Sequence, residues 1–305
     1  MNLIDKIALD LKIDSSYLSR IAKRSNFYYR DYKIPKKNGG DRYLSQPSPE
    51  LKTLQYWIVC NIMTHLMISE ASFAYKKGDS IKKHAELHKN SKHVLHTDIK
   101  NFFNSIHFEH LYNILKDNKT IFDNLGLDFN ASLQDVENIC FRKNSLCIGA
   151  VSSPIISNII MFPFDTTVID YCKTNNLTYS RYADDIYISS NSYIKEDIIK
   201  FLDDELKKLG FDINMSKTKF YSSKYRRKIT GIVITNDSQV SIGTERRNNI
   251  KKMIYNKLIH NIGNSEQIIG YLSFVKDIEP NTYNNLIIKY SRYCEGDIID
   301  ALRKR

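Results

Sequence analysis

Three aspartates give this sequence its clearest chemical pattern. Asp98 lies near the end of the apolar run VLHTDI at 94–99, which predicts a strand, and Asp184 and Asp185 interrupt an alternating run at 177–190 that predicts a hairpin. Carboxylate oxygens bind Mg²⁺, and two Mg²⁺ ions about 3.5–4 Å apart stabilise both the attacking and the leaving oxygen when a nucleotidyl group is transferred. Because small misplacements of such ligands cost much rate, a strand end beside a tight turn suits them. The pattern predicts nucleotidyl transfer.

The chain contains its own control for this interpretation. A second acidic pair, at 203–204 in KFLDDELKKLG, lies in a helical pattern that is typical of a solvated face, so an Asp-Asp pair alone is weak support. The pair at 184–185 differs because strand-like runs flank it and because Tyr182 and Tyr187 lie on either side. The context therefore favours a catalytic site more than the acids do.

The elements that must position these acids mix helices with strands. The expected helices are residues 3–25, as one or two short helices with Asp14 or Ser15 capping the second, then 49–68, one beginning near 101, 155–170, 193–209 and most of the chain after Thr244. The expected strands are two hairpins, at 28–47 around Asn38-Gly39 and at 177–190, with strands at 94–99, 211–214, 228–235 and 239–243. Since these elements do not alternate regularly, we expect an α+β fold.

The charge of the chain favours a polyanionic partner. The 305 residues contain 45 Lys and Arg against 34 Asp and Glu, a formal net charge of +11 with a pI near 9.2. The segment 217–260 alone holds eleven Lys and Arg and two acids, so the excess is concentrated. Concentrated positive charge suits a phosphate backbone, since each neutralised phosphate releases counterions. A basic but otherwise ordinary soluble protein is the alternative, and charge alone does not decide between them.

Cysteine spacing and hydropathy exclude several classes of protein. The five cysteines form no CxxC pair, which argues against a zinc site or a disulfide framework: Cys60, Cys140, Cys147, Cys172 and Cys294. The N-terminus, MNLIDKIALDLKID, carries acids and lacks a long apolar core, so it is not a signal peptide. No uncharged apolar stretch reaches about 18 residues, so we expect no membrane span and a reduced, cytoplasmic protein.

Three segments, in order along the chain, resemble the motifs of reverse transcriptases. YADD at 182–185 resembles the YxDD catalytic box in its bacterial form, HTDIKNFFNSI at 96–106 looks like the first catalytic motif, and GAVSSPIISNII at 149–160 is similar to the QGxxxSP motif between them. The resemblance covers roughly Tyr28 to Tyr293. It implies a right-hand polymerase with an N-terminal helical segment at 1–27, fingers at 28–93, a palm at 94–227, and palm-edge strands with a mostly helical thumb at 228–305.

The resemblance implies a role for each acid. Asp98 and Asp184 would bridge two Mg²⁺ ions, Asp185 would be a third and less direct carboxylate, and the backbone carbonyl of Ile99 would complete one metal shell. Phe103 matches the bulky residue that excludes a ribose 2′-OH, because a flat aromatic wall leaves that hydroxyl neither space nor partner. A place in the core is the alternative for this ring.

The same family binds the triphosphate of the incoming dNTP with one lysine and one arginine of a fingers hairpin. Here Lys36, Lys37 and Arg42 flank the expected turn. Arg42 matches the arginine, the two lysines compete for the other role, and a solvated basic turn is the alternative. Lys217, in INMSKTKF, matches the lysine that donates a proton to pyrophosphate or orients it, with Lys219 close by.

The motif at 149–160 departs from the family in two places. The usual Gln-Gly is Ile148-Gly149 here, and the usual proline of GAPSSP is Val151. Loss of the glutamine removes a polar contact near the incoming nucleotide, so nucleotide affinity or fidelity would differ. Gly149 is retained, and we expect it to keep the turn beside the nucleotide.

Several segments resemble the retron members of the family in particular. AYKKGDSIKKHAELH at 74–88 resembles the retron insertion with Asn-Ala-x-x-His, KITGIVIT at 228–235 resembles the Val-Thr-Gly element, and QPSPELKTLQYWI at 46–58 and IIGYLSF at 268–274 match the fingers helix and thumb. Contacts with RNA are expected from these elements and from the basic face of the thumb, at His84, His88, Thr230, Gly231, Arg246, Arg247, Lys251, Lys252 and Tyr255.

Plain structural roles are the alternatives for these RNA contacts. A zincin site needs Glu directly after its first histidine, and Ala85 occupies that place, so RNA contact or local packing remains for the two histidines. In the thumb, one helical stripe is apolar, and the opposite face suits either phosphates and stacked bases or solvent. The stripe consists of Ile250, Met253, Ile254 and Leu258.

The resemblance implies a self-contained reaction. A retron enzyme binds its own structured non-coding RNA, primes from a guanosine 2′-OH, and copies part of that RNA into single-stranded DNA that stays branched to the remainder. Known systems pair this product with an effector protein in anti-phage defence. Two other functions stay open: a related bacterial reverse transcriptase of diversity-generating or group II intron type, and an RNA-binding scaffold with a vestigial polymerase site. Retention of all three aspartates argues against the scaffold.

Overall fold

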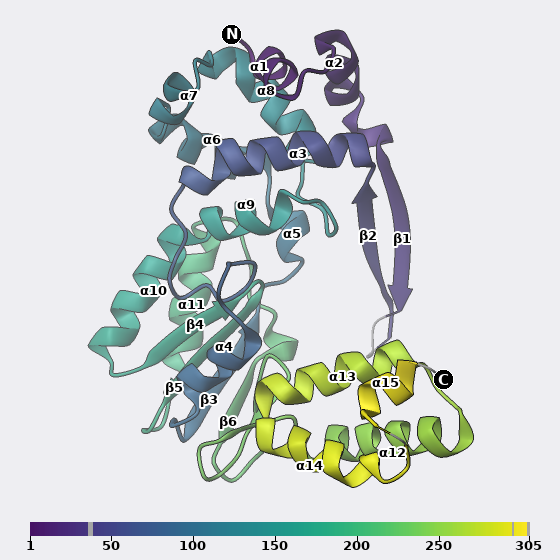
Figure 1. Ribbon diagram of the computed structural model, residues 1–305. Coiled ribbons are helices and arrows are strands. Elements are labelled where there is room, and N and C mark those ends of the chain that lie inside the picture. The colour runs from purple at the N-terminus through teal and green to yellow at the C-terminus, as the bar shows by residue number, and fades with distance from the viewer. Residues whose placement is uncertain (36–38, 295, 304–305) are drawn as a thin grey trace. The chain divides into compact units, whose positions relative to one another are not determined.

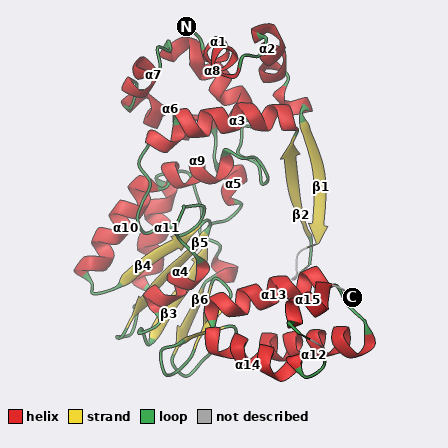
Figure 2. Ribbon diagram, viewed as in Figure 1, coloured by secondary structure: helices red, strands yellow, loops and turns green. Residues whose placement is uncertain are grey.

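The computed structural model describes residues 1–35, 39–294 and 296–303 (Figure 1). Helices and strands are mixed along the chain (Figure 2). By compactness the chain divides into two units. The first holds Met1–Lys77, His96–Ile186 and Lys195–Thr218, and the second holds Gly78–Leu95, Tyr187–Ile194 and the chain from Lys219 onward. Within the described residues, no helix is long and apolar enough to cross a membrane.

The first unit is largely helical. Its helices are α1 (Leu3–Leu11), α2 (Ser15–Lys23), α3 (Pro49–Asn61), α5 (Phe102–Ser105), α6 (Phe108–Asp117), α7 (Thr120–Asn124), α8 (Phe129–Cys140), α9 (Ser153–Ile160), α10 (Phe162–Thr174) and α11 (Asp197–Lys207). Asp14 caps α2, because its carboxylate accepts a hydrogen bond from the backbone N–H of Tyr17 at 2.8 Å. The two short N-terminal helices predicted from the sequence are confirmed.

Three predicted helices are shorter or divided. Helix α3 ends at Asn61, where the side-chain amide donates to the Trp57 carbonyl at 2.8 Å and competes with the backbone donors of a further turn. The predicted helix at 155–170 is two helices, because Pro163 has no N–H for a continuous helix and is accommodated in the first turn of α10. Helix α11 begins at Asp197, four residues after the predicted start.

The strands of the first predicted hairpin are confirmed. Strand β1 (Tyr29–Pro35) pairs antiparallel with β2 (Asp41–Pro47) along its whole length. Most of its side chains are exposed, as expected for a two-stranded ribbon. The predicted turn includes Lys36 and Lys37, which lie outside the described residues.

A four-stranded sheet positions the predicted acids. Its order is β4 (Thr178–Tyr182), β5 (Asp185–Ser190), β3 (His93–Asp98) and β6 (Lys219–Ser222). The strand predicted at 94–99 and the hairpin predicted at 177–190 are confirmed. The strand predicted at 211–214 is wrong, because that segment makes one isolated bridge to Ile99 before the chain turns into a 3₁₀ helix. Strand β6 is too short to show an alternation in the sequence.

The second unit packs helices around one apolar core. Its helices are α4 (Ile81–His88), α12 (Thr244–His260), α13 (Ser265–Ile278), α14 (Pro280–Ser291) and α15 (Ile298–Arg303), and its antiparallel sheet has the order β7 (Arg227–Ile229), β8 (Ile232–Ile234) and β9 (Val240–Ser241). The predicted apolar stripe of α12 is confirmed, since its residues belong to this core. The strand predicted at 228–235 is two strands, because Thr230 and Gly231 form a turn with φ of 43° and 86°.

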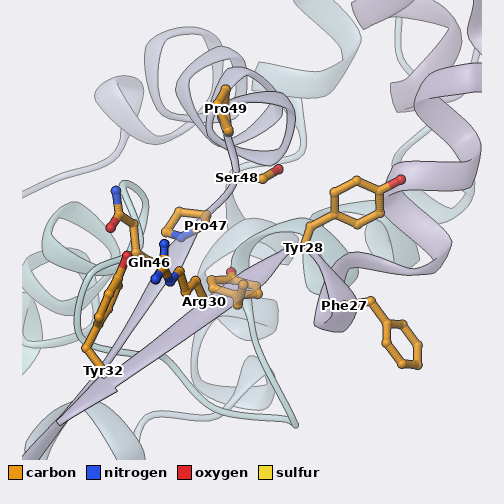
Figure 3. Close-up of a pocket in the computed structure, with 9 residues that line it drawn as sticks. Phe27, Tyr28, Arg30, Tyr32, Gln46, Pro47, Ser48 and Pro49 are labelled. Atoms are coloured by element: carbon orange, nitrogen blue, oxygen red, sulfur yellow. The ribbon is translucent and has the colours of Figure 1, made fainter.

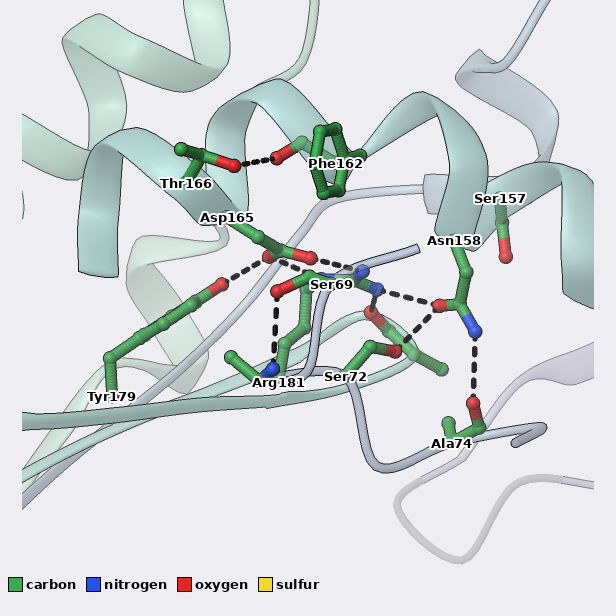
Figure 4. A network of polar contacts seen from close by, with 12 residues as sticks. Ser69, Ser72, Ala74, Ser157, Asn158, Phe162, Asp165, Thr166, Tyr179 and Arg181 are labelled. Carbon is green, nitrogen blue, oxygen red and sulfur yellow. Dashed lines mark hydrogen bonds and ion pairs between the residues drawn. The ribbon is translucent and has the colours of Figure 1, made fainter. Parts of the chain in front are cut away.

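A buried ion pair organises the first unit next to the predicted acids (Figure 4). The Arg181 guanidinium, which is fully buried, donates to the Asp165 carboxylate at 2.9 and 2.7 Å, to Asn158 Oδ1 at 3.2 Å and to the Ala183 carbonyl at 2.9 Å. The Tyr179 hydroxyl donates to the same carboxylate at 2.6 Å. Because a buried charge is tolerated only when it is paired and hydrogen-bonded, this network joins α9, α10 and β4 to the turn before Asp184.

Removal of the Arg181 guanidinium should destabilise the protein strongly. We expect Arg181→Met to lower the free energy of unfolding by about 3–5 kcal/mol, because the substitution leaves the Asp165 carboxylate buried without its cation. Urea denaturation followed by circular dichroism at neutral pH measures the change. The control is Lys207→Met, which breaks the exposed Lys207–Asp203 pair on α11 and should leave the free energy of unfolding nearly unchanged. Similar losses in the two variants would contradict the assigned role.

Candidate active site

The structure joins Asp98 to the turn at 183–184 through the backbone. Asp98 ends β3, and the N–H of the next residue, Ile99, donates to the Asp184 carbonyl at 3.0 Å. The Asp98 side chain is only 5% exposed, and Asp184 is half-buried. Burial raises the pKa of Asp184 to about 6, and the charges of Asp185 and Asp98 add to the rise. The predicted meeting of a strand end with a hairpin tip is therefore present.

Three side chains contact the carboxylates of Asp98 and Asp185, and the sequence singled out only Lys217 among them. Asn214 donates to Asp98 Oδ1 at 3.0 Å, and Lys217 Nζ lies 2.8 Å from Asp98 Oδ2. The Asp185 carboxylate instead lies 2.7 Å from His96 Nε2. His96 stands two residues before Asp98 on the same strand, so its place could have been inferred from the period-two alternation of a strand.

The turn between β4 and β5 has an unusual backbone. Ala183 has a φ of 56°, in the left-handed region that alanine seldom adopts. The guanidinium of Arg181 donates to the Ala183 carbonyl at 2.9 Å and so holds this conformation. Such strain persists only where the surroundings enforce it, and here it sets the direction of the adjoining Asp184.

The donor set suits a metal ion that is shared with a substrate. Within the described part of the chain, no group of three or more His, Cys, Asp or Glu side chains forms a complete metal site. The charge of Asp98, however, disfavours ionisation of Asp184. A cation bound between the two carboxylates would relieve this repulsion. Mg²⁺ typically takes one or two protein carboxylates and fills its remaining positions with water and phosphate oxygens. The residues present therefore fit such an ion.

The predicted nucleotide-binding residues of the first unit have different surroundings. Phe102 is buried against Phe211 with ring centroids 6.0 Å apart, whereas Phe103 is half-buried. Phe102 is therefore the ring that packs in the core, and Phe103 stays partly accessible to solvent. Arg42 is exposed on β2, and Lys36 and Lys37 lie outside the described residues.

Gly149 has a steric role in addition to any contact with a nucleotide. Its φ is 115°, and a Cβ at this position would lie 2.8 Å from the Ser45 carbonyl oxygen of β2. The Ser45 N–H donates to the Ile148 carbonyl at 2.8 Å, which binds this loop to the hairpin. A glycine is required because any larger residue would push the loop and β2 apart.

Gln55 on α3 organises the same loop, a role that the resemblance of segment 46–58 did not indicate. Its fully buried amide donates to the Tyr29 hydroxyl and to the Ile139 carbonyl, both at 2.9 Å. Its Oε1 accepts from the backbone N–H of Val151 at 3.1 Å. A proline, the usual family residue at 151, has no N–H for this bond. The departure at 151 is thus coupled to a buried glutamine.

The two histidines of α4 are core residues of the second unit. Both are fully buried. His84 Nδ1 lies 3.1 Å from the Thr230 hydroxyl, and His88 Nδ1 lies 2.7 Å from the Ser189 hydroxyl. Of the alternatives left by the sequence, the geometry matches local packing, because neither side chain has a surface on which RNA could lie. Thr230 is thereby joined to α4.

The predicted RNA-binding residues of the thumb fall into two groups. The Arg247 guanidinium is engaged by Glu279 at 2.9 Å, so it has a structural partner. Lys252 and Tyr255 are exposed, and Arg246 lies over the Phe274 ring at 5.2 Å.

A cavity of about 440 Å³ lies beside the Phe274 ring. It is lined by Ile81, Thr230, Arg246, Gln267, Gly270, Tyr271 and Phe274. Lys251 is half-buried and Gly231 belongs to the adjoining turn.

A second cavity, of about 380 Å³, lies at the base of the hairpin (Figure 3). Aromatic rings and Arg30 form much of its wall, and the Phe27 ring at its rim is 87% exposed. None of the residues predicted to bind nucleotide or metal lines it. It is therefore distinct from the carboxylate site.

Comparison with known proteins finds similarity over nearly the whole chain. The reverse transcriptase (RNA-dependent DNA polymerase) family matches residues 34–234. The Retron Ec83 reverse transcriptase of Escherichia coli is 33% identical over 303 residues, covering 90% of this chain and 94% of that protein. The Retron Ec86 reverse transcriptase of Escherichia coli is 31% identical over 298 residues, covering 96% and 89%.

A solved structure supports the fold alone. Apo telomerase from Candida tropicalis is similar with a TM-score of 0.52 and 13% identity, over 90% of this chain and 60% of that one. The similarity shows the right-hand polymerase fold and, at this identity, nothing of partners. It agrees with the α+β class predicted from the sequence.

Installing the usual family residue at 151 should destabilise this chain. We expect Val151→Pro to lower the free energy of unfolding by roughly 1–3 kcal/mol, because Gln55 Oε1 would remain buried without its donor. Val151→Ala is the matched control, since it keeps the N–H. Urea denaturation of both variants measures the difference, and equal stabilities would show that the bond contributes nothing.

The buried His88 predicts sensitivity to acid. Burial lowers the pKa of His88 to about 3, whereas an unfolded histidine titrates near 6.5. Between those values only the unfolded chain takes up the proton, so stability should be complete above pH 6.5 and fall as the pH drops, by up to about 1.4 kcal/mol per pH unit.

Denaturation at pH 7.5, 6.0 and 5.0 measures this dependence on pH. We expect His88→Gln to be less stable than the parent at pH 7.5 but to lose less stability on acidification. His65→Gln, at an exposed histidine of the first unit, is the control and should keep the parent slope. An unchanged slope in His88→Gln would refute the assignment.

Proposed function

This chain belongs to the retron family of reverse transcriptases, which are RNA-directed DNA polymerases, and from that membership we propose that it copies its own structured non-coding RNA into single-stranded DNA. In this proposal a guanosine 2′-OH primes synthesis, and the DNA remains branched to the RNA. An effector protein that uses this product in anti-phage defence is a further proposed partner, and the cytoplasm is the proposed location.

The observation that carries the proposal is the joining of Asp98 to the turn that presents Asp184. The carboxylate of Asp184, on a tight turn beside the strand end at Asp98, has its ionisation disfavoured by burial and by neighbouring charge, so the site is incomplete until a cation is added. A template, a primer end and a dNTP supply the remaining oxygens. Asp185, held by His96, would act through the shape of the site more than by direct ligation.

Membership of the family implies dependence on a divalent metal, and we propose two Mg²⁺ ions held by Asp98, Asp184 and the Ile99 carbonyl. When bound, such a pair stabilises the charge on the attacking and leaving oxygens. Lys217 pairs with Asp98, a position from which it would donate a proton to pyrophosphate or orient it. Asn214 orients the Asp98 carboxylate through its amide.

Further residues of the first unit would bind the nucleotide. We propose that Arg42, with Lys36 or Lys37, contacts the triphosphate and that Phe103 excludes a ribose 2′-OH. For RNA, we propose the half-buried Arg246 and the exposed Lys252 and Tyr255 of α12, which combine cations with an aromatic ring and so suit phosphates and stacked bases.

We propose the division into domains that the sequence predicts. It places an N-terminal helical segment at 1–27, fingers at 28–93, a palm at 94–227 and the thumb with its edge strands at 228–305.

Nucleic acid that copurifies with the protein tests the proposal. We expect the cell-expressed protein, together with its native flanking sequence, to carry a DNA strand joined to RNA through a 2′ linkage, which sequencing after RNase and debranching treatment identifies. DNA that matches a variable repeat or an intron would instead favour the other bacterial types. RNA without DNA would favour a scaffold.

Loss of one carboxylate should abolish polymerisation without unfolding the protein. We expect Asp184→Asn to lower Mg²⁺-dependent incorporation of dNTPs on an RNA template by about 10³-fold or more, because the ligand set loses a charge. Since the substitution also removes repulsion with Asp98 and Asp185, the melting temperature in EDTA at neutral pH should not fall.

The matched control for this variant is Asp204→Asn, an exposed acid of the helical pair on α11, which should retain full activity. Primer extension and differential scanning fluorimetry measure the two effects. Undiminished DNA synthesis by Asp184→Asn would remove Asp184 from the active site.

A further inference from the structure

Tyr75 has a strained backbone that no assigned role explains. Its φ is 62°, in the left-handed region that bulky residues seldom adopt, and its side chain is 53% exposed. A tyrosine in this conformation is less favourable than a glycine, and burial in the core does not compensate for it. Backbone strain of this kind is concentrated at functional sites, which suggests a functional role for Tyr75.

Hydrogen bonds fix the segment that leads to Tyr75. The Arg181 N–H donates to the Ala71 carbonyl at 2.8 Å, and the Phe73 N–H donates to the Arg181 carbonyl at 2.9 Å, so the segment lies along β4. At its end, the Asn158 amide donates to the Ala74 carbonyl at 2.9 Å (Figure 4). The residue before Tyr75 is thus held by α9.

The same network holds the residue before Asp184. Arg181 donates from its guanidinium to the Ala183 carbonyl and also to Asn158 Oδ1, which accepts in addition from the Ser72 hydroxyl at 2.8 Å. Two left-handed residues, Tyr75 and Ala183, are therefore fixed by one set of buried polar groups. The backbone before Tyr75 and the backbone before Asp184 are thus held by the same side chains.

The Tyr75 ring lies near residues of the proposed active site. Its ring meets the Phe103 ring edge to face, with centroids 6.5 Å apart. Burial raises the pKa of the Tyr75 hydroxyl, Asp184 and Tyr182 add to the rise, and Arg42 opposes it. A half-exposed aromatic ring thus lies among a carboxylate, a cation and the residue proposed to sense the sugar.

We propose that Tyr75 is a nucleotide-contacting residue, whose ring packs against the base or sugar of the incoming deoxynucleoside triphosphate and forms an aromatic wall with Phe103. The inference rests on the proposed active site and gives a role to a residue for which the sequence motifs suggest none. An aromatic face suits this task because it contacts any of the four bases without hydrogen bonds and so favours none. Asn158, in turn, is a positioning residue that acts through the backbone before Tyr75.

Steady-state kinetics with poly(rA)·oligo(dT), dTTP and Mg²⁺ tests the contact. We expect Tyr75→Ala and Tyr75→Gly to raise KM for dTTP about tenfold, the size expected for one lost stacking contact, with kcat within about threefold of the parent. Tyr75→Phe should keep KM within about twofold, because the ring and not the hydroxyl makes the contact. Tyr56→Ala, at a tyrosine of α3 that is 56% exposed, is the matched control.

Thermal denaturation separates this role from a structural one. If Tyr75 serves only to hold the fold, Tyr75→Gly should lower the melting temperature. If the strain serves nucleotide binding, the glycine variant should melt at or above the parent temperature while KM rises, since glycine adopts a φ of 62° without strain.

The dTTP affinity of the parent and of the Tyr75 and Tyr56 variants can also be compared without turnover, by measuring dTTP binding to the enzyme on a dideoxy-terminated primer. A parent enzyme that binds dTTP but does not extend a primer would contradict the proposed function and leave Tyr75 to be judged by binding alone. Parental dTTP affinity in both Tyr75→Ala and Tyr75→Gly would overturn the inference. An equal loss in Tyr56→Ala would overturn it as well, because the effect would not be specific to Tyr75.

Discussion

The first unit depends on one requirement, that the buried guanidinium of Arg181 must have all its donors satisfied. Asp165 neutralises its charge, while Asn158 and the Ala183 carbonyl accept its remaining hydrogen bonds. These acceptors come from α10, α9 and the turn after β4, so the three elements can meet in only one arrangement. A buried ion pair of this kind adds little net stability over apolar packing, but it penalises any misalignment heavily. Its contribution is to position the turn.

The acids themselves work against folding in the absence of substrate. Burial and two neighbouring carboxylates raise the pKa of Asp184, which means that the charged form is disfavoured where it is needed. Lys217 and Asn214 contact the Asp98 carboxylate, and His96 contacts that of Asp185, whereas no such cation contacts Asp184 among the residues that the structure describes. An arrangement that is only partly neutralised by the protein retains affinity for a cation that arrives with a triphosphate. Carboxylates whose charge the protein neutralises only in part are therefore consistent with catalysis.

The sequence predicts the site better than it predicts what supports the site. Asp98, Asp184 and the hairpin follow from local alternation, because a strand end and a two-residue turn are encoded by neighbouring residues. Gln55 and Arg181 have their effect through partners 84 and 16 residues away, which no local pattern reports. The failed strand at 211–214 has the same cause, since alternation shows which side chains are buried but not whether a neighbouring strand is present.

Near the carboxylates, residues with strained backbones lie next to the hydrogen bonds that hold them. Tyr75, Asn101 and Ala183 are all non-glycine residues with φ between 51° and 62°, and each directly precedes or adjoins a segment with a proposed role. Asparagine tolerates this conformation, whereas tyrosine and alanine need an external constraint. Both of the latter adjoin hydrogen bonds that end at Asn158 or Arg181. The fold thus uses buried polar contacts to hold two unfavourable backbones, and the proposed nucleotide contact gives a reason for the side-chain directions that result.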